Sequence, residues 1–174
     1  TFRLAGSNPP PNHRKDLAEE LIRRKSGFEY VSFGHTRTKG EPFELLRKSG
    51  CISLFFGVES GSQRILDKAV NKKTTVENVR EHLKQAKAAG MLTSASLIAP
   101  LPFDDEAALQ ETVDLMLECQ PDGVSVYLPI VVPGTAWYNS PEDYGISFSG
   151  DKYSALKNYQ IRFLMPPPLW DPLP

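Results

Sequence analysis

The chain has 174 residues, a formal net charge of -1 and 24% charged residues. This composition lacks the basic character of a dedicated nucleic-acid-binding protein, and no apolar run approaches the roughly 20 residues that a membrane-spanning helix needs. The two cysteines, Cys51 and Cys119, are too few for a disulfide scaffold. We therefore expect a protein of a reducing, cytoplasmic setting, with neither a nucleic acid nor a membrane as its partner.

One pattern recurs along the chain: a charged segment, then glycine, then a short apolar run. It appears as RRKSGFEYVSF, LRKSGCISLFF, AKAAGMLTSASLI and CQPDGVSVYLP. Glycine directly after a helix commonly takes the left-handed conformation that ends the helix. Runs of Val, Ile, Leu and Phe between turn signals are typical of strands buried on both faces. The pattern predicts strands at 1–6, 28–33, 52–57, 92–98 and 123–128.

The longer segments between these strands have apolar residues at helical spacing. They predict helices over 12–25, 74–89 and 105–119. Thr74 and Glu77 have the spacing of a capping box, and acidic residues at 104–106 lie where a helix dipole favours negative charge. The residues expected to face the core are Leu17, Leu21 and Ile22; Val76, Val79, Leu83 and Ala86; and Leu109, Val113, Met116 and Leu117.

Strands that alternate with helices predict a parallel α/β sheet with right-handed crossovers. An open doubly wound sheet and part of a (β/α) barrel both fit, and a closed eight-stranded barrel typically takes about 250 residues. Residues 1–138 form the predicted α/β domain, and 139–174 an extension with a proline-rich tail. Because unpaired strand edges recruit partners, residues 1–6 are a predicted surface for self-association.

In either architecture, function lies at the carboxyl ends of the strands. A carboxylate there can accept from a ribose diol, a following lysine can pair with a carboxylate or phosphate, and the apolar strand around Ile98 offers a flat edge for an adenine ring. This predicts a nucleoside-type cofactor site. The polar residues at these ends are Ser7, Asn8, Asn12, His35, Thr36, Arg37, Glu59, Ser60, Ser62, Lys72, Lys73, Asp104 and Asp105.

Simpler interpretations exist for the same residues. Glu59 can pair with a neighbouring loop lysine, and Lys72 and Lys73 can be solvated. The cysteines fit small buried hydrophobic side chains, and His35 is the only histidine whose position after a strand suggests a functional role. The sequence contains no metal-binding or phosphate-loop motif, and no Ser/His/Asp triad is predicted.

Two stretches carry a family resemblance: LLRKSGCISLFFGVESGSQRILDKAVNKKTTVENV, and then AKAAGMLTSASLIAPLPFDDEAALQETVDLMLECQPDGVSVYLPIVVPGTAWY. Together they strongly resemble the central to C-terminal part of the radical S-adenosylmethionine (SAM) enzyme core, in its cobalamin-associated and methylthiotransferase-like branches. The resemblance covers roughly residues 41–138, and residues 1–40 fit more loosely. Its order of motifs is specific, whereas each motif alone is weak.

The resemblance implies a partial parallel (β/α) barrel of about five strands that forms one wall of a SAM pocket. It implies that the intact protein cleaves SAM reductively with a [4Fe–4S] cluster and generates a 5′-deoxyadenosyl radical. Glu59 is expected near the ribose, with Ser60 lining the same pocket, and Lys72 near the methionine carboxylate. The remaining implied SAM-binding residues are Ser96 near the ribose, Ile98 near the adenine, and Leu128 on the last strand.

The sequence departs from the family in three places. The C-x-x-x-C-x-x-C cluster loop and the glycine motif of the second strand are absent, and Pro100 and Phe103 occupy positions where the family has glycine. We therefore expect a C-terminal portion of an enzyme core that partners the N-terminal part of the same polypeptide and alone binds no cluster and is inactive. Two alternatives are a non-catalytic α/β module that binds a nucleotide or protein partner, and a complete flavodoxin-like domain. The substrate cannot be read from the sequence.

Overall fold

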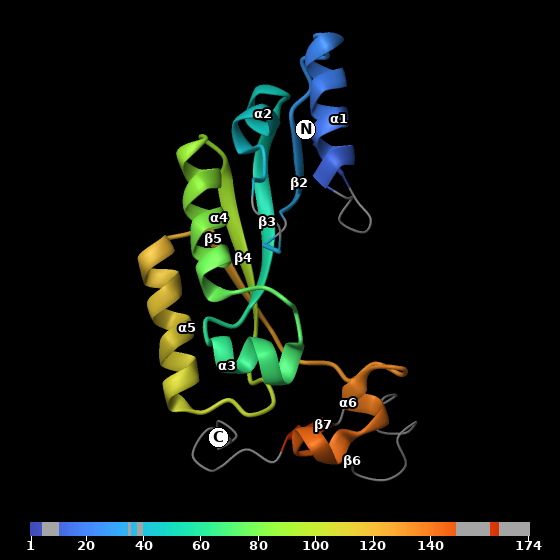
Figure 1. Ribbon diagram of the computed structural model, residues 1–174, viewed down its shortest axis with the longest axis vertical. Helices are drawn as coiled ribbons and strands as arrows, with labels where there is room; N and C mark the ends of the chain where they lie inside the picture. Colours follow the sequence, from blue (N-terminus) through green and yellow to red (C-terminus); the bar gives the residue numbers. More distant parts are fainter. Residues whose placement is uncertain (5–10, 35, 38–39, 149–160, 164–174) are drawn as a thin grey trace.

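The computed structural model describes residues 1–4, 11–34, 36–37, 40–148 and 161–163. A sheet of five parallel strands, which lie in sequence order, forms its centre (Figure 1). This order confirms the partial (β/α) barrel and makes the flavodoxin-like alternative wrong, because a doubly wound sheet reverses its order at a switch point. The strands are β1 (Phe2–Arg3), β2 (Tyr30–Gly34), β3 (Cys51–Glu59), β4 (Leu92–Ile98) and β5 (Gly123–Tyr127).

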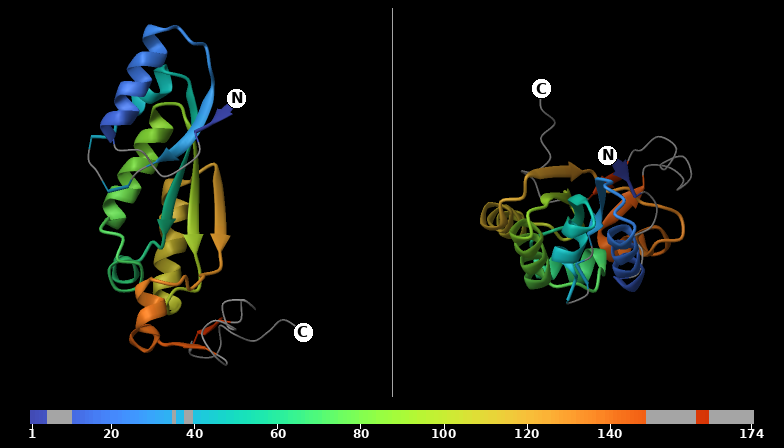
Figure 2. Two further views of the ribbon diagram at one scale, coloured as in Figure 1. Left: turned by 90° about the vertical axis from the view of Figure 1, so that its right-hand side faces the viewer. Right: turned by 90° about the horizontal axis from the view of Figure 1, so that it is seen from above.

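Helices cover one face of the sheet (Figure 2). They are α1 (Pro11–Arg23), α2 (Phe43–Lys48), α4 (Val76–Ala88) and α5 (Glu106–Cys119). Gly50 and Gly90 follow α2 and α4 with φ of +103° and +80°, as the glycine pattern predicts. After α5, however, Gln120 takes the left-handed conformation with φ +45°, and Gly123 already belongs to β5.

The remaining elements are short. α3 (Gln63–Ile65) continues into the π-helix η1 (Leu66–Val70) after β3. After β5 come α6 (Ala136–Asn139), the 3-10 helix η2 (Pro141–Tyr144), and the antiparallel strands β6 (Ile146–Phe148) and β7 (Ile161–Phe163). The first strand is shorter than predicted: β1 covers only Phe2–Arg3, and residues 5 and 6 lie outside the described residues.

The core lies between the sheet and the helices. Leu54, Phe56 and Val58 of β3 pack there against Val79 and Leu83 of α4, all fully buried. The predicted apolar stripe of α4 is thus confirmed, with Ala86 buried and Val76 partly buried.

The predicted stripe of α5 is wrong for two of its residues. Val113 and Leu117 are 49% and 68% exposed, whereas Ala108, Leu115 and Cys119 are buried. α5 packs beside α4 at the β5 end of the sheet. Because no described element covers the other flank of α5, the apolar residues on that flank remain exposed.

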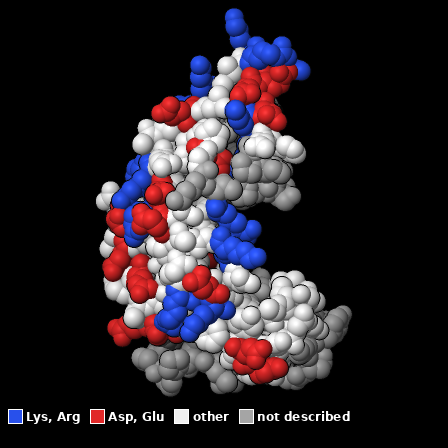
Figure 3. Space-filling model, in the orientation of Figure 1, with Lys and Arg blue, Asp and Glu red and all other residues white. Residues whose placement is uncertain are grey.

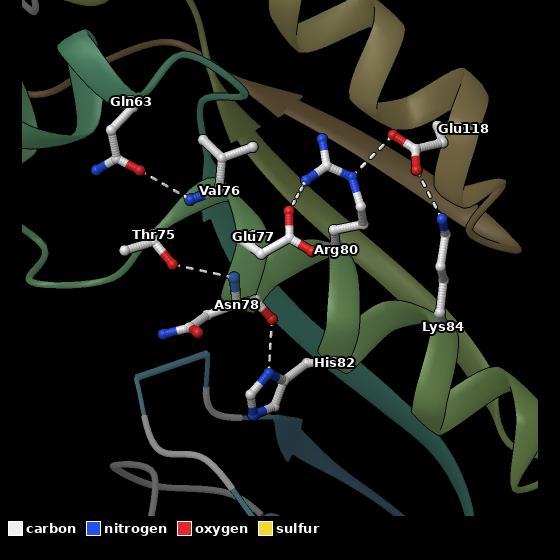
Figure 4. A network of polar contacts seen from close by, with 9 residues as sticks. All are labelled: Gln63, Thr75, Val76, Glu77, Asn78, Arg80, His82, Lys84 and Glu118. Carbon is white, nitrogen blue, oxygen red and sulfur yellow. Dashed lines mark hydrogen bonds and ion pairs between the residues drawn. The ribbon is translucent and has the colours of Figure 1, made fainter.

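α4 begins one residue later than the predicted capping box. Thr75 is its N-cap and accepts a hydrogen bond from the Asn78 N–H at 3.0 Å (Figure 4). Thr74 is buried instead, and its hydroxyl donates to the Thr36 carbonyl at 2.6 Å. The Gln63 side chain of α3 accepts from the Val76 N–H at 2.9 Å. The loop between η1 and α4 is therefore tied to two neighbouring segments.

Ion pairs connect the helices on the outside and in the core. Arg80 of α4 contacts both Glu77 and Glu118, and Lys84 contacts Glu118 at 2.6 Å. Acidic and basic side chains are interspersed over this part of the surface (Figure 3). In the core, Arg14 of α1 pairs with Glu41 at 2.5 Å. Burial raises the pKa of Glu41, although the Arg14 charge opposes this shift.

Candidate functional site

The open face of the sheet presents a row of small residues near the carboxyl ends of its central strands. Gly57 of β3 pairs in register with Ser96 of β4, which in turn pairs with Ser125 of β5. Leu54, Phe56 and Val58 point to the opposite, helix-covered face. Where a sheet presents only glycine and serine, other groups can approach the backbone closely, and over Gly57 the side-chain ends of Glu59 and Lys72 do so. The row is thus a shelf beside the strand ends.

β3 ends next to this shelf in a strained turn. The Ser60 N–H donates to the Val58 carbonyl at 2.9 Å, which closes a three-residue γ-turn around Glu59. Glu59 has φ +66°, and the pairing of β3 with β4 is irregular between Gly57 and Glu59. Strain of this kind costs on the order of 1–3 kcal/mol per residue and clusters at functional sites. The turn directs a carboxylate to the edge of the shelf.

Glu59 forms an ion pair with Lys72 across the shelf. The Lys72 Nζ lies 2.6 Å from Glu59 Oε1 and also donates to the Gly57 carbonyl. Both side chains are 17% exposed. The simpler interpretation of Glu59 as the partner of a loop lysine therefore describes a real contact, whereas Lys72 is not a solvated lysine. An ammonium group has three N–H donors, so Lys72 retains one beyond these two bonds, and Glu59 Oε2 retains its capacity to accept.

The segment before Lys72 explains how a residue 13 positions after Glu59 reaches it. η1 winds as a π-helix, and Asn71 ends it in the left-handed conformation with φ +50°. Single π-helical turns occur frequently at functional sites. Lys73, which follows Lys72, also has positive φ and is exposed. The turn at 71–73 reverses the chain and returns the Lys72 side chain to β3.

The other predicted site residues lie in different surroundings. Ser96 is on the shelf and largely buried, and Ile98 is two residues further along the same face of β4, partly buried. Ser60 is 3% exposed and turns toward α5, where its Oγ lies 3.3 Å from Thr112 Oγ1. Leu128 lies just beyond β5 and is 74% exposed. The structure thus brings Glu59, Lys72, Ser96 and Ile98 to one rim, while the Ser60 hydroxyl faces a helix.

Some residues of this rim are not evident from sequence patterns. The Gly61 N–H donates to Thr112 Oγ1 at 2.8 Å, so Thr112 of α5 anchors the turn. Gly57 and Ser125 complete the shelf through strand register alone. Ser7, Asn8 and His35, three of the predicted polar residues, lie outside the described residues.

The loop after β4 is held by side chains that close on their own backbone. Asp104 Oδ2 accepts from the Leu101 N–H at 2.6 Å, and Asp105 caps α5 by accepting from the Ala108 N–H. Burial raises the pKa of Asp104. Phe103 has φ +67°, the conformation that favours the glycine found there in the family. Ala99–Pro100 is a cis peptide bond.

Below the shelf, the open face of the sheet is hollowed and aromatic. A hollow of about 570 Å³ is lined by residues of all five strands, including Arg3, Phe33, Phe55, Ser94 and Tyr127. Phe33 and Phe55 meet edge to face with their centroids 5.7 Å apart, and the Arg3 guanidinium lies 5.4 Å from the Phe33 centroid. The strand composition predicts that both faces of the sheet are buried. Within the described residues, however, this face of the sheet is open.

The chain's own thiols do not suit a metal cluster. Cys51 and Cys119 are both buried, and burial raises the pKa of Cys51 to about 11. Iron–sulfur clusters are held by several thiolates, and the sequence contains only these two cysteines. No group of three or more His, Cys, Asp and Glu side chains among the described residues is placed to hold a metal ion. Within the same residues, no helix is both long and apolar enough to cross a membrane.

Known proteins share this sequence and architecture. The sequence profile of the radical SAM superfamily matches residues 1–116. The chain belongs to the radical SAM superfamily. This confirms the resemblance to the radical SAM enzyme core.

Two curated relatives of this radical SAM chain are anaerobic magnesium-protoporphyrin IX monomethyl ester cyclases. The Rubrivivax gelatinosus protein is 32% identical over 130 residues, which are 70% of this chain and 23% of that protein. The Cereibacter sphaeroides protein is 30% identical over 163 residues, 88% of this chain and 26% of that protein. The chain thus spans about a quarter of the length of these relatives.

A solved structure shares the fold. The radical SAM methyltransferase TsrM from Kitasatospora setae, with tryptophan and a SAM analog bound, is 18% identical and superposes with a TM-score of 0.59. The match covers 67% of this chain and 24% of that protein.

Proposed function

We propose that this chain forms one wall of the SAM pocket of a radical SAM enzyme. The observation that carries the proposal is the Glu59–Lys72 pair, which lies on a strained turn beside a shelf of small residues. Together with a [4Fe–4S] cluster, bound SAM would supply radical chemistry by reductive cleavage. The protein's own contribution is to bind and orient the cofactor.

Each residue of the rim has a distinct proposed task. Glu59 accepts hydrogen bonds from the ribose hydroxyls through Oε2, because Oε1 is engaged by Lys72. Lys72 donates its third N–H to the methionine carboxylate. The ribose lies against the shelf at Ser96, and the adenine packs against Ile98. Ser60 and Leu128 receive no task in this proposal, because Ser60 faces Thr112 and Leu128 lies beyond the strand.

The cluster ligands are proposed to come from another segment of the polypeptide, because the two thiols of this chain are buried and too few. The 174 residues alone should therefore not cleave SAM. Anaerobic reconstitution of this chain with iron and sulfide, followed by reductant and SAM, tests this. Formation of 5′-deoxyadenosine above background would overturn the proposal that the cluster ligands lie elsewhere.

We further propose that the aromatic hollow receives the substrate. Its lining includes Phe33, Phe55, the guanidinium of Arg3 and serine hydroxyls, and none of its described lining residues carries a carboxylate. These groups suit a flat, largely apolar molecule that bears an anion. The curated relatives, by their names, act on a magnesium-protoporphyrin monomethyl ester. Absorbance titration of the full-length protein with protoporphyrin IX is the direct measurement, and lack of binding would contradict this part of the proposal.

Calorimetric titration of SAM into the full-length, reconstituted protein tests the pocket itself. We expect Glu59→Ala to weaken SAM binding by roughly 1–3 kcal/mol, the cost of buried polar groups left unpaired. Glu59→Gln should do less harm, because its amide oxygen still accepts from a hydroxyl. Lys72→Met should also weaken binding, because the carboxylate loses its cation.

Glu118→Ala is the matched control. Glu118 also pairs with a lysine, Lys84, at 2.6 Å, but on the outside of α5. Exposed pairs contribute about 0–1 kcal/mol to stability, so this variant should leave SAM affinity unchanged. If Glu59→Ala behaves like Glu118→Ala, Glu59 only stabilises the fold. SAM binding without any 5′-deoxyadenosine from the full-length protein would instead favour a non-catalytic nucleotide-binding module.

A further inference from the structure

Trp137 connects the loop after β5 to the segment that carries Lys72. It lies in α6, and its indole N–H donates to the Ala69 carbonyl at 2.8 Å, across 68 residues of sequence. Trp137 belongs to the stretch PGTAWY, to which the roles proposed above assign nothing. The bond is partly buried, so water competes with it less than at an exposed site.

The acceptor of this bond, the Ala69 carbonyl, lies shortly before Lys72. Ala69 is in the last turn of η1, where helix carbonyls lack partners within the helix. Only Val70 and the left-handed Asn71 separate it from Lys72. The indole therefore fixes the end of the π-helix immediately before the turn that directs Lys72 toward Gly57 and Glu59.

The ring of Trp137 makes a second connection. It packs against a buried cluster that contains Ile65, Ala69 and Leu101. Ile98 packs against the same cluster. The cluster against which Trp137 packs is thus built both from the segment that leads to Lys72 and from the loop that follows β4.

We propose that Trp137 is a positioning residue for the SAM pocket. It acts through Lys72, by fixing the carbonyl end of η1, and it does not itself touch SAM. This inference rests on the proposed function, because it assumes that Lys72 binds the cofactor. The loop after β5, although distant in sequence, thereby determines the position of the Lys72 ammonium group.

A double-mutant cycle in the full-length protein tests the coupling. Trp137→Phe keeps an aromatic ring but removes the N–H donor together with part of the indole. We expect it to weaken SAM binding about three- to tenfold, the usual effect of one lost hydrogen bond, and to lower the thermal midpoint because part of the packed ring is lost. In a Lys72→Met background the same substitution should change SAM affinity less than about twofold, because the group through which it acts is gone.

Tyr138→Phe is the control on the same helix. Its ring meets Phe148 with centroids 6.4 Å apart, and the bond to the Ala69 carbonyl belongs to Trp137, so SAM affinity should remain unchanged. An equal effect of Trp137→Phe in both backgrounds would overturn the inference, as would no effect in either. If Glu59→Ala and Lys72→Met weaken SAM binding while Trp137→Phe does not, only the role of Trp137 fails. If Lys72→Met has no effect, the proposed pocket fails as well.

Discussion

Phe55 and Phe56 are neighbours in β3, yet they belong to two different environments. Phe56 is fully buried under the helices, whereas Phe55 lines the open hollow. The same division holds for the glycines: a methyl group on Gly34 would lie 2.2 Å from the Phe56 ring, and one on Gly57 would lie 2.7 Å from Glu59 Oε1 and Lys72 Nζ. Alternation along a strand therefore places the packed core on one face and the proposed binding site on the other.

Substitution of the two phenylalanines is the most direct test of this difference between the faces. Phe56→Ala should lower the free energy of unfolding by about 3–5 kcal/mol, the usual cost of removing a buried aromatic ring. Phe55→Ala loses mainly its contact with Phe33, which corresponds to roughly 0.5–1.5 kcal/mol, but should weaken protoporphyrin IX binding. Urea unfolding of the full-length protein, followed through hydrogen exchange of β3 amides, measures the first effect. Equal destabilisation by both would show that the hollow is packed core.

The two glycines provide a smaller contrast. Gly34→Ala drives a methyl group into the Phe56 ring, and such overpacking costs about 1–3 kcal/mol of stability. In Gly57→Ala, the atoms nearest to the added methyl group are the side-chain ends of Glu59 and Lys72 rather than backbone, so the fold should tolerate it. Separation of the two charged groups should nevertheless lower SAM affinity, which calorimetry measures. The contrast fails if Gly57→Ala destabilises the protein as much as Gly34→Ala.

The sequence predicts the structure best where one local signal decides it. Glycine after a charged segment located β3 and β4 to within a residue or two, and the apolar spacing of α4 identified its buried face. Apolar spacing predicts the buried face of α5 less well, because this helix has apolar residues on both sides. There the position of the helix at the end of the sheet decides which of them are buried, and periodicity does not contain that information.

The candidate site also has features that the sequence predicts and features that it does not. A sequence motif predicts Glu59 and Lys72 as site residues. Their ion pair, however, depends on the γ-turn and on η1, which local patterns do not specify. Thr74 and Thr75 are equally good caps by type, and tertiary contact with Thr36 selects Thr75. Arg14 and Glu41 pair across 27 residues. Such contacts arise only when the fold is complete.

Ser60 directly follows Glu59, and substitution of the two residues should have different effects. Its Oγ contacts Thr112 and accepts from the Ser62 N–H at 3.1 Å. Ser60→Ala should therefore cost about 1 kcal/mol of stability, the typical net value of a hydrogen bond, and leave SAM affinity unchanged, in contrast to Glu59→Ala. Thermal melts and SAM titration of both variants make the comparison. A marked loss of affinity would instead place the Ser60 hydroxyl in the pocket, as the family resemblance implies.

The smallest expected effect is a pH dependence at Asp104. Burial raises the pKa of this carboxyl, an effect that the Leu101 N–H and Arg64 partly offset. The folded state then binds the proton more tightly than the unfolded state, so the ionised group lowers stability as pH rises from the unfolded pKa of about 3.9 through the raised folded pKa. Asp104→Asn cannot ionise but still offers an oxygen to Leu101. Its stability relative to the native protein should therefore increase over that pH range and then level off. Urea titrations between pH 4 and 8 measure this difference, to which Glu41 contributes equally in both proteins. A relative stability that decreases with pH would show that the ionised carboxylate stabilises the loop after β4.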